Sequence, residues 1–408
     1  MKREQLLAGI ELGPRQFTAA AGQLREGSRL SVQAVESIPA QGFEKEGLSD
    51  PIECSDAIAR LIRQLEKAAG QRVSTAAVAF PTNHLKSANA SASIPIPEPG
   101  AGISRQDVEK AIATCRTLSL DYDRQILHSF EREFTVDSQS GVRNPVGLSG
   151  RKLTVELHLV TAVSLAVQNL TRVISRSGLE VEEFVMPGLA CGEAVLSAQD
   201  QDLGVTLLRI GDHQTEAVLY SDGEVRETFL FPGGSDDLIE HFSRNLRIPR
   251  LSAEHLLGQV RTIEEPPNGD SVPLRAGVGA SVRSFPGDQV RQLARHRCKE
   301  LLQRIHRRLA TSSTFLDSAS GVVAVGQLAR LEGFLEMAEE LLNLPARLGA
   351  VREVELPPGV ILRSQDTTAI GLIRHTLRRR SAPALSASPL PGWLKPLEGF
   401  RKVLQEYF

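Results

Sequence analysis

The sequence predicts an α/β protein made of two similar lobes. Residues 6–39 alternate in short apolar runs broken by turn residues, which is typical of three successive strands. Residues 205–231 repeat this pattern, and residues 12–16 (LGPRQ) align with residues 210–214 (IGDHQ). Each copy is followed by helical and further strand patterns, so we expect a duplicated architecture whose lobes enclose a cleft.

Length and composition indicate several compact units. The chain has 408 residues, of which 41% are hydrophobic and 24% are charged, so it is too long for one ordinary domain and too apolar for a disordered chain. The 47 Lys and Arg residues nearly balance the 49 Asp and Glu residues, for a net charge of -2. We therefore expect no nucleic-acid partner.

The cysteines and the apolar runs indicate a cytoplasmic protein without a spanning segment. The four cysteines are scattered and form no CxxC pair, which argues against a zinc site and a disulfide framework and suits a reducing compartment: Cys54, Cys115, Cys191 and Cys298. The N-terminal apolar stretch is too short for a signal peptide, and no run approaches about 18 apolar residues.

Hydrophobic periodicity and capping residues place the other elements. Helices are predicted over residues 55–69 with Ser55 as N-cap, 104–118 with a capping-box-like start at Ser104, 164–176, 289–310, 331–342 and about 367–379. Strands are predicted over residues 72–80, 124–137, 151–163 and 321–325.

Residues 124–161 carry a family resemblance. This block resembles a pattern of the bacterial FtsA family of cell-division proteins, within the actin-like ATPase superfamily. The matching positions are Ile126, Leu127, His128, Glu133, Phe134, Val136, Asp137, Gln139, Gly141, Pro145, Gly147, Gly150, Leu153, His158, Val160 and Thr161. Weaker similarity runs from residue 8 to residue 380. The resemblance implies an actin-like, ribonuclease H-like fold of two lobes with a family-specific insertion.

The resemblance also implies a division into subdomains. These are the core of lobe 1 (1–83 and 164–204), the inserted subdomain (84–163), the core of lobe 2 (205–234 and 296–366), a smaller subdomain of lobe 2 (235–295), a closing helix that returns to lobe 1 (367–380), a flexible linker (381–391) and an amphipathic helix (392–408).

The motifs that would grip a nucleotide depart from the superfamily pattern. The first phosphate turn resembles D.GTS but reads ELGPR at residues 11–15, and Pro14 has no N–H to donate. The second resembles DIGGGTTD but reads RIGDHQTE at residues 209–216, so Arg209 reverses the charge at the metal position.

The positions that the resemblance assigns to this degenerate nucleotide site are Glu11, Gly13, Arg15, Gly211, Gly233, Gly234, Glu254 and Gly326. Two interpretations stay open. Arg15 and Arg209 could compensate the charge of a metal-free nucleotide, or the cleft has lost binding. ATP is thus a possible ligand, whereas we expect weak or absent hydrolysis and no catalytic residue, because the acid that would hold the metal is missing.

The C-terminal residues 392–408 (GWLKPLEGFRKVLQEYF) predict an amphipathic membrane-surface helix after the Pro- and Ser-rich linker. The residues expected to contact lipid are Trp393, Leu394, Leu397, Phe400, Leu404, Tyr407 and Phe408. Nearby arginines, among them Arg374, Arg378, Arg379 and Arg380, are expected to attract anionic lipid. A helix packed on the body is the alternative.

The predicted anchor is weak. Five or six large side chains, each partly buried at roughly 1 kcal/mol, give about 5 kcal/mol, which corresponds to sub-millimolar binding. Several anchors joined in a polymer would hold by avidity, so a weak anchor favours a self-associating protein.

The basic helix predicted over residues 289–310 contains a possible partner site. The ordinary interpretation is that its basic face is solvated and its apolar face packs against the body of the protein. In the FtsA family an R..E pair in this helix receives the C-terminal tail of FtsZ, the tubulin-like division protein, and Arg297 and Glu300 match that pair.

The resemblance, together with the amphipathic tail, therefore implies an adaptor that tethers the FtsZ ring to the cytoplasmic side of the cell membrane at the division site. Its expected partners are the FtsZ tail, other copies of itself and the anionic membrane surface. The rival hypotheses are a PilM-like scaffold of a secretion or pilus machine and a working actin-like ATPase.

Overall fold

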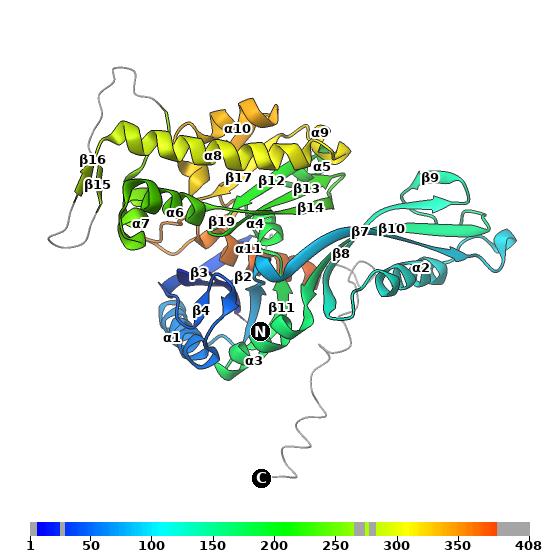
Figure 1. Cartoon of the computed structure of the whole chain (residues 1–408). Coiled ribbons are helices and arrows are strands. Elements are labelled where there is room, and N and C mark those ends of the chain that lie inside the picture. Colours follow the sequence, from blue (N-terminus) through cyan, green and yellow to red (C-terminus); the bar gives the residue numbers. More distant parts are fainter. Residues whose placement is uncertain (1–5, 25–28, 265–273, 277–282, 382–408) are drawn as a thin grey trace, which may run out of the picture.

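The computed structural model describes residues 6–24, 29–264, 274–276 and 283–381. Two lobes, each with a β-sheet flanked by helices, lie against each other, and a smaller sheet extends sideways from them (Figure 1). The predicted α/β class with two lobes and an insertion is confirmed.

The first lobe contains a six-stranded sheet in the order β11-β6-β1-β2-β3-β19. Its strands are β1 (Leu7–Leu12), β2 (Gln16–Leu24), β3 (Leu30–Pro39), β6 (Thr75–Ala79), β11 (Glu180–Val185) and β19 (Val354–Glu355). Its helices are α1 (Pro51–Ala69), α3 (Ser164–Arg176), α4 (Pro187–Val195) and α11 (Asp366–Ser381). Ala8 and Ile10 share a core with α1, whereas Leu7 packs with α11, so both faces of the sheet are covered.

The second lobe repeats this arrangement. Its sheet has the order β14-β13-β12-β17-β18, formed by β12 (Val205–Ile210), β13 (Gln214–Ser221), β14 (Glu224–Pro232), β17 (Val322–Gly326) and β18 (Ala346–Leu348). Its helices include α6 (Ser235–Leu246), α7 (Arg250–Gln259), α8 (Gly287–Leu309) and α10 (Phe334–Leu342). β1 pairs antiparallel to β2 and parallel to β6. In the same way, β12 pairs antiparallel to β13 and parallel to β17. The predicted repeat is therefore present.

The inserted unit has a sheet and a core of its own. Its sheet has the order β7-β10-β8-β9, from β7 (Leu85–Pro95), β8 (Arg124–Val136), β9 (Gln139–Val142) and β10 (Lys152–Val163). The apolar residues of α2 (Arg105–Leu118) and of these strands form a separate cluster. The unit contacts lobe 2 through β14, where the Thr228 N–H donates to Nε2 of buried His158 at 2.9 Å.

Short elements complete the chain. They are β4 (Phe43–Glu44), β5 (Gly47–Leu48), β15 (Leu274–Ala276), β16 (Arg283–Phe285), α5 (Ala198–Leu203), α9 (Ser313–Leu316) and the 3-10 turns η1 (Thr82–His84), η2 (Pro99–Ala101) and η3 (Leu328–Arg330).

The helix starts test the capping predictions. The prediction of Ser55 as N-cap is wrong, because α1 begins at Pro51 and the Asp50 side chain accepts the N–H groups of Ile52 and Glu53. Proline suits this first helical position because it has no N–H to leave unpaired. The capping box at Ser104 is confirmed, with Asp107 as its second member.

Candidate functional site: the cleft between the lobes

The two repeated turns face each other across a cleft of about 640 Å³. In both turns the glycine N–H donates to the carbonyl of the glutamine three residues later, from Gly13 to Gln16 and from Gly211 to Gln214, at 3.0 Å in each case. The cleft is lined by six of the positions assigned to the nucleotide site: Glu11, Gly13, Arg15, Gly211, Glu254 and Gly326. Gly233 lines an adjoining pocket of about 290 Å³.

Gly234 has a structural role next to the second turn. A Cβ atom on Gly234 would lie 2.1 Å from the Gly211 carbonyl oxygen and 2.7 Å from that of Asp212. The following N–H groups of Ser235 and Asp236 donate to these two carbonyls at 3.0 and 2.9 Å. Glycine is therefore required because the start of α6 approaches the turn closely.

Gly326 has a comparable role at the end of β17. Its φ is +125°, and a Cβ atom there would lie 2.1 Å from the carbonyl oxygen of Ile210. Backbone conformation and close approach to β12 explain this glycine without a ligand.

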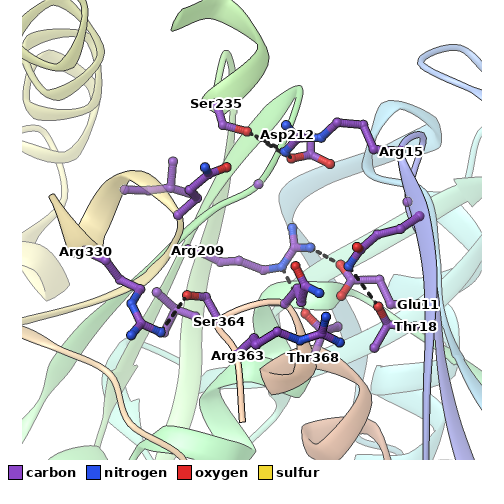
Figure 2. Close-up of a pocket in the computed structure, with 18 of the residues that line it drawn as sticks. Glu11, Arg15, Thr18, Arg209, Asp212, Ser235, Arg330, Arg363, Ser364 and Thr368 are labelled. Carbon is purple, nitrogen blue, oxygen red and sulfur yellow. Dashed lines mark hydrogen bonds and ion pairs between the residues drawn. The ribbon is translucent and has the colours of Figure 1, made fainter. Parts of the chain in front are cut away.

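Arg209 lines the cleft and is held by three other side chains, of which Figure 2 labels Glu11 and Thr368. Its guanidinium bonds to the Glu11 carboxylate from lobe 1, to Glu216 Oε1 at 2.8 Å and to Thr368 Oγ1 at 3.4 Å. Glu216 is fully buried, and its Oε2 also accepts the Gly188 N–H at 2.6 Å. Burial alone would lower the pKa of Arg209, but the two carboxylates outweigh burial and raise it.

Arg15 makes a second set of contacts across the cleft. Its guanidinium bonds to the Asp212 carboxylate in the opposite turn, to Ser235 Oγ at 2.9 Å and to Glu254 Oε1 at 3.5 Å. Arg15 and Asp212 are about three-quarters buried, with side chains 24% and 26% exposed. Burial acts to lower the pKa of Arg15, but Asp212 and the other acids raise it above its ordinary value.

Sequence reasoning missed the cationic rim at the other end of the cleft. Arg261, Arg330 and Arg363 line the cavity from three separate segments, and Arg330 Nη1 donates to Ser364 Oγ at 3.2 Å (Figure 2). Arg363 pairs with Asp366 at 3.3 Å. No superfamily motif includes these positions, so a sequence signal for them was lacking.

The chemistry of the cleft follows from these charges. A divalent metal needs carboxylate or water oxygens as ligands. The Glu11 carboxylate is already paired with the Arg209 guanidinium. Within the described ranges, no group of three or more His, Cys, Asp or Glu side chains is arranged to hold a metal ion. The cleft has space for a small ligand, but its two turns are already joined by side chains.

Arg297 and Glu300 lie together on α8. Arg297 Nη1 donates to Glu300 Oε2 at 2.6 Å, and its Nη2 lies 3.3 Å from Asp237 Oδ2 of α6. Both side chains are partly exposed, at 32% and 41%. A peptide binding here would exchange these internal contacts for its own.

The expected lipid-facing helix lies outside the described residues, as do Trp393, Leu394, Leu397, Phe400, Leu404, Tyr407, Phe408 and nearly all of the linker. In the described part, no helix is both long and apolar enough to cross a bilayer.

The arginines of α11 are engaged within lobe 1. Arg374 donates to backbone carbonyls, and Arg378, Arg379 and Arg380 pair with the carboxylates of Glu193, Glu183 and Glu182. The expectation that these charges attract lipid is therefore weakened, because acids of the body already compensate three of them.

Two histidines of the inserted unit and Cys191 are structural. His128 Nε2 accepts the Met186 N–H at 3.0 Å, and His158 bridges Asn89 and Thr228. Cys191 is buried, and burial raises the pKa of its thiol to about 12.

Comparison with known proteins agrees with this geometry. Residues 82–161 match the family model described as the SHS2 domain inserted in FtsA. The chain is 27% identical over 389 residues to cell division protein FtsA of Pseudomonas aeruginosa, covering 92% of this chain and 90% of the relative. It is 25% identical over 385 residues to FtsA of Escherichia coli, covering 91% and 90%.

Solved structures share the fold at low identity. A PilM-PilN type IV pilus biogenesis complex gives a TM-score of 0.64 at 16% identity, covering 93% of this chain and 99% of the matched chain. MreB5 of Spiroplasma citri bound to ADP gives 0.54 at 9% identity, covering 92% and 98%. Together, these comparisons show that the chain contains the SHS2 domain inserted in FtsA, resembles the FtsA cell-division proteins along about nine-tenths of its length, and shares its two-lobed fold with the PilM and MreB5 structures.

Proposed function

We propose that this protein is an adaptor that anchors the FtsZ ring to the cytoplasmic side of the cell membrane and self-associates into actin-like polymers. The observation that carries this proposal is the FtsA-type sheet inserted at Leu85–Val163 of a two-lobed body. Similarity to FtsA over more than nine-tenths of the chain supports the same role at the division septum.

The membrane part of the proposal is supported by the amphipathic sequence of residues 392–408, which follows the body after a short linker. The test is co-sedimentation with vesicles containing anionic lipid, with and without FtsZ, using the full chain and a chain truncated after residue 390. Truncation is expected to abolish pelleting. Equal pelleting of both forms would remove the anchor.

A matched pair of single variants sharpens this test. Phe400→Glu places a charge on the apolar stripe, whereas Gln405→Glu places the same charge on the polar face of the same segment. Phe400→Glu is expected to reduce pelleting strongly, and Gln405→Glu should change it little. Equal losses would indicate simple charge repulsion by the lipid.

The FtsZ part of the proposal is supported by the exposed ion pair of Arg297 and Glu300. An FtsZ C-terminal tail peptide, titrated by fluorescence anisotropy, is expected to bind Arg297→Ala about tenfold more weakly, equal to about 1.4 kcal/mol. Arg307→Ala is the control, since Arg307 is exposed on the same helix about 15 Å further along its axis. Absence of peptide binding by the unmodified chain would instead favour a PilM-like scaffold, whose fold is similar.

We also propose that the cleft has little or no ATPase activity. Arg209 occupies the metal position and is bound by Glu11 and Glu216, so the charge needed to hold Mg²⁺ is compensated. Phosphate release and calorimetric titration with ATP and Mg²⁺ test this directly. Turnover at a rate typical of enzymes, above about 1 per second, would make the protein a working ATPase.

A further inference from the structure

The duplicated strands place opposite charges at equivalent positions. In the alignment of the two repeats, Leu12 corresponds to Ile210, so Glu11 at the end of β1 corresponds to Arg209 at the end of β12. The two side chains meet across the cleft as an ion pair, with only 17% and 14% of their surfaces exposed. An ion pair between equivalent positions of the two repeats therefore joins the two lobes directly.

We call the Glu11–Arg209 ion pair and the contacts around it the first clasp. Neighbouring residues of both lobes hold this pair in place. Glu216 lies beside Arg209 in the register of β12 and β13 and binds its guanidinium at 2.8 Å. Glu216 Oε2 in turn accepts the N–H of Gly188, at the start of α4 in lobe 1. Thr368 of α11, also in lobe 1, accepts from Arg209 Nε at 3.4 Å. Opening the cleft would separate all of these groups.

A second clasp lies at the tips of the turns. Arg15 of lobe 1 contacts Asp212 and Ser235 (Figure 2) and also Glu254, and these three residues come from a turn and two helices of lobe 2. One guanidinium therefore joins three segments of the opposite lobe. Charge-assisted contacts of this kind are the stronger hydrogen bonds, and a water-poor site strengthens them further.

We propose that these two clasps hold the lobes closed without any bound ligand, so that closure is built into the chain. The Arg15 and Arg209 guanidiniums occupy the region between the turns where phosphate and metal would otherwise join the lobes. Opening the cleft would break these charge-assisted contacts, whereas replacing only one partner of the Glu11–Arg209 pair would leave an uncompensated charge buried in the closed form and would favour opening. This inference extends the proposed absence of turnover: a permanently closed adaptor has no need of a nucleotide cycle to adopt its assembly-competent shape.

The distance between the lobes is the direct readout. Cysteines introduced at Lys45 in lobe 1 and Asn245 in lobe 2 provide exposed positions for spin labels. The four native cysteines are all buried, so background labelling is low. Pulsed electron–electron resonance on the full chain, with and without ATP and Mg²⁺, then measures the distribution of distances between the lobes.

The variants separate the clasps from general destabilisation. The triple variant Glu11→Gln, Arg209→Met, Glu216→Gln removes the first clasp without leaving an unpaired charge, and Arg15→Gln removes the second at a partly exposed position. Asp121→Asn is the matched control, because it removes one charge from the exposed pair with Lys86, and neither residue lines the cleft or the adjoining pocket. Circular dichroism identifies the folded variants.

We expect one narrow distribution of distances between the two spin labels for the unmodified chain and for the control, and we expect ATP to leave it unchanged. Variants lacking both clasps should gain a population at longer distance. A broad distribution that narrows on adding ATP and Mg²⁺, or clasp variants identical to the control, would overturn the inference. Phosphate release measured on the same samples distinguishes the proposed closure from the proposed lack of ATPase activity. If the lobes are closed before ATP is added and the chain still hydrolyses ATP, only the proposed lack of ATPase activity is contradicted.

Discussion

Lowering the pH should loosen the contact between the inserted sheet and lobe 2, because a neutral histidine lies at its centre. His158 is 3% exposed, and its Nε2 accepts the Thr228 N–H at 2.9 Å. The proton of the neutral ring therefore lies on Nδ1, which donates to Asn89 Oδ1 at 2.6 Å. A second proton on Nε2 would be repelled by the Thr228 N–H group, and the Thr228 hydroxyl, 2.8 Å from the same nitrogen, would have to act as an acceptor.

The pKa gives the size and the direction of the effect. Burial, assisted by the charge of Arg132, lowers the pKa of His158 from 6.5 to about 4. The unfolded chain therefore binds this proton first, so the stabilising contribution is complete above pH 6.5 and is lost as the pH falls toward 4. At about 1.4 kcal/mol per pKa unit, the loss approaches about 3 kcal/mol at low pH and is about 2.5 kcal/mol at pH 4.5.

Urea unfolding of the full chain at pH 7.0 and pH 4.5, compared with His158→Gln, isolates this contribution. Other groups titrate equally in both proteins, whereas glutamine does not titrate at residue 158. The unmodified chain should lose about 2 to 3 kcal/mol more than the variant over this interval. Equal losses would show that His158 is not held neutral by this contact, and the interpretation would be wrong.

Three further predictions test the packing. Gly234→Ala should lower the free energy of unfolding by about 2 kcal/mol or more in urea unfolding, because its Cβ would overlap two carbonyl oxygens. The control is Gly258→Ala on α7, whose Cβ would meet no atom within 4 Å and which should be neutral or slightly stabilising. Asp50→Ala should cost about 1 kcal/mol of stability in the same assay by removing the α1 cap, and no change would contradict the assignment. Thiol titration at pH 8 should detect almost no reactive cysteine in the native chain and all four in denaturant, because burial raises the pKa of Cys54, Cys191 and Cys298 to about 12 and Cys115 is buried as well.

The inserted sheet gives this chain a second connection between its lobes. Besides His158, Arg132 of β8 pairs with Glu227 of β14 at 3.3 Å, and Ser87 Oγ donates to the Thr228 carbonyl at 2.8 Å. The clasps in the cleft and this contact involve different residues of lobe 2. Relative movement of the lobes would have to break both, which agrees with an adaptor of fixed shape.

The sequence by itself determined the positions of most helices and strands and the internal repeat. These features depend on hydrophobic periodicity and on local residues such as Ser104 and Asp107, which act within one turn of chain. The strands predicted over residues 124–137 and 151–163 appear as β8 and β10, nearly to the residue.

Only the tertiary structure shows which partners the charged residues of the cleft bind. From the sequence, Arg15 and Arg209 were compatible both with compensating the charge of a nucleotide and with a cleft that has lost nucleotide binding. The fold brings each next to an acid about two hundred residues away, Asp212 for Arg15 and Glu11 for Arg209. A charge has no periodicity, and its partner depends on which distant segments the packed lobes bring together, so only the folded arrangement reveals whether it is free to bind a ligand.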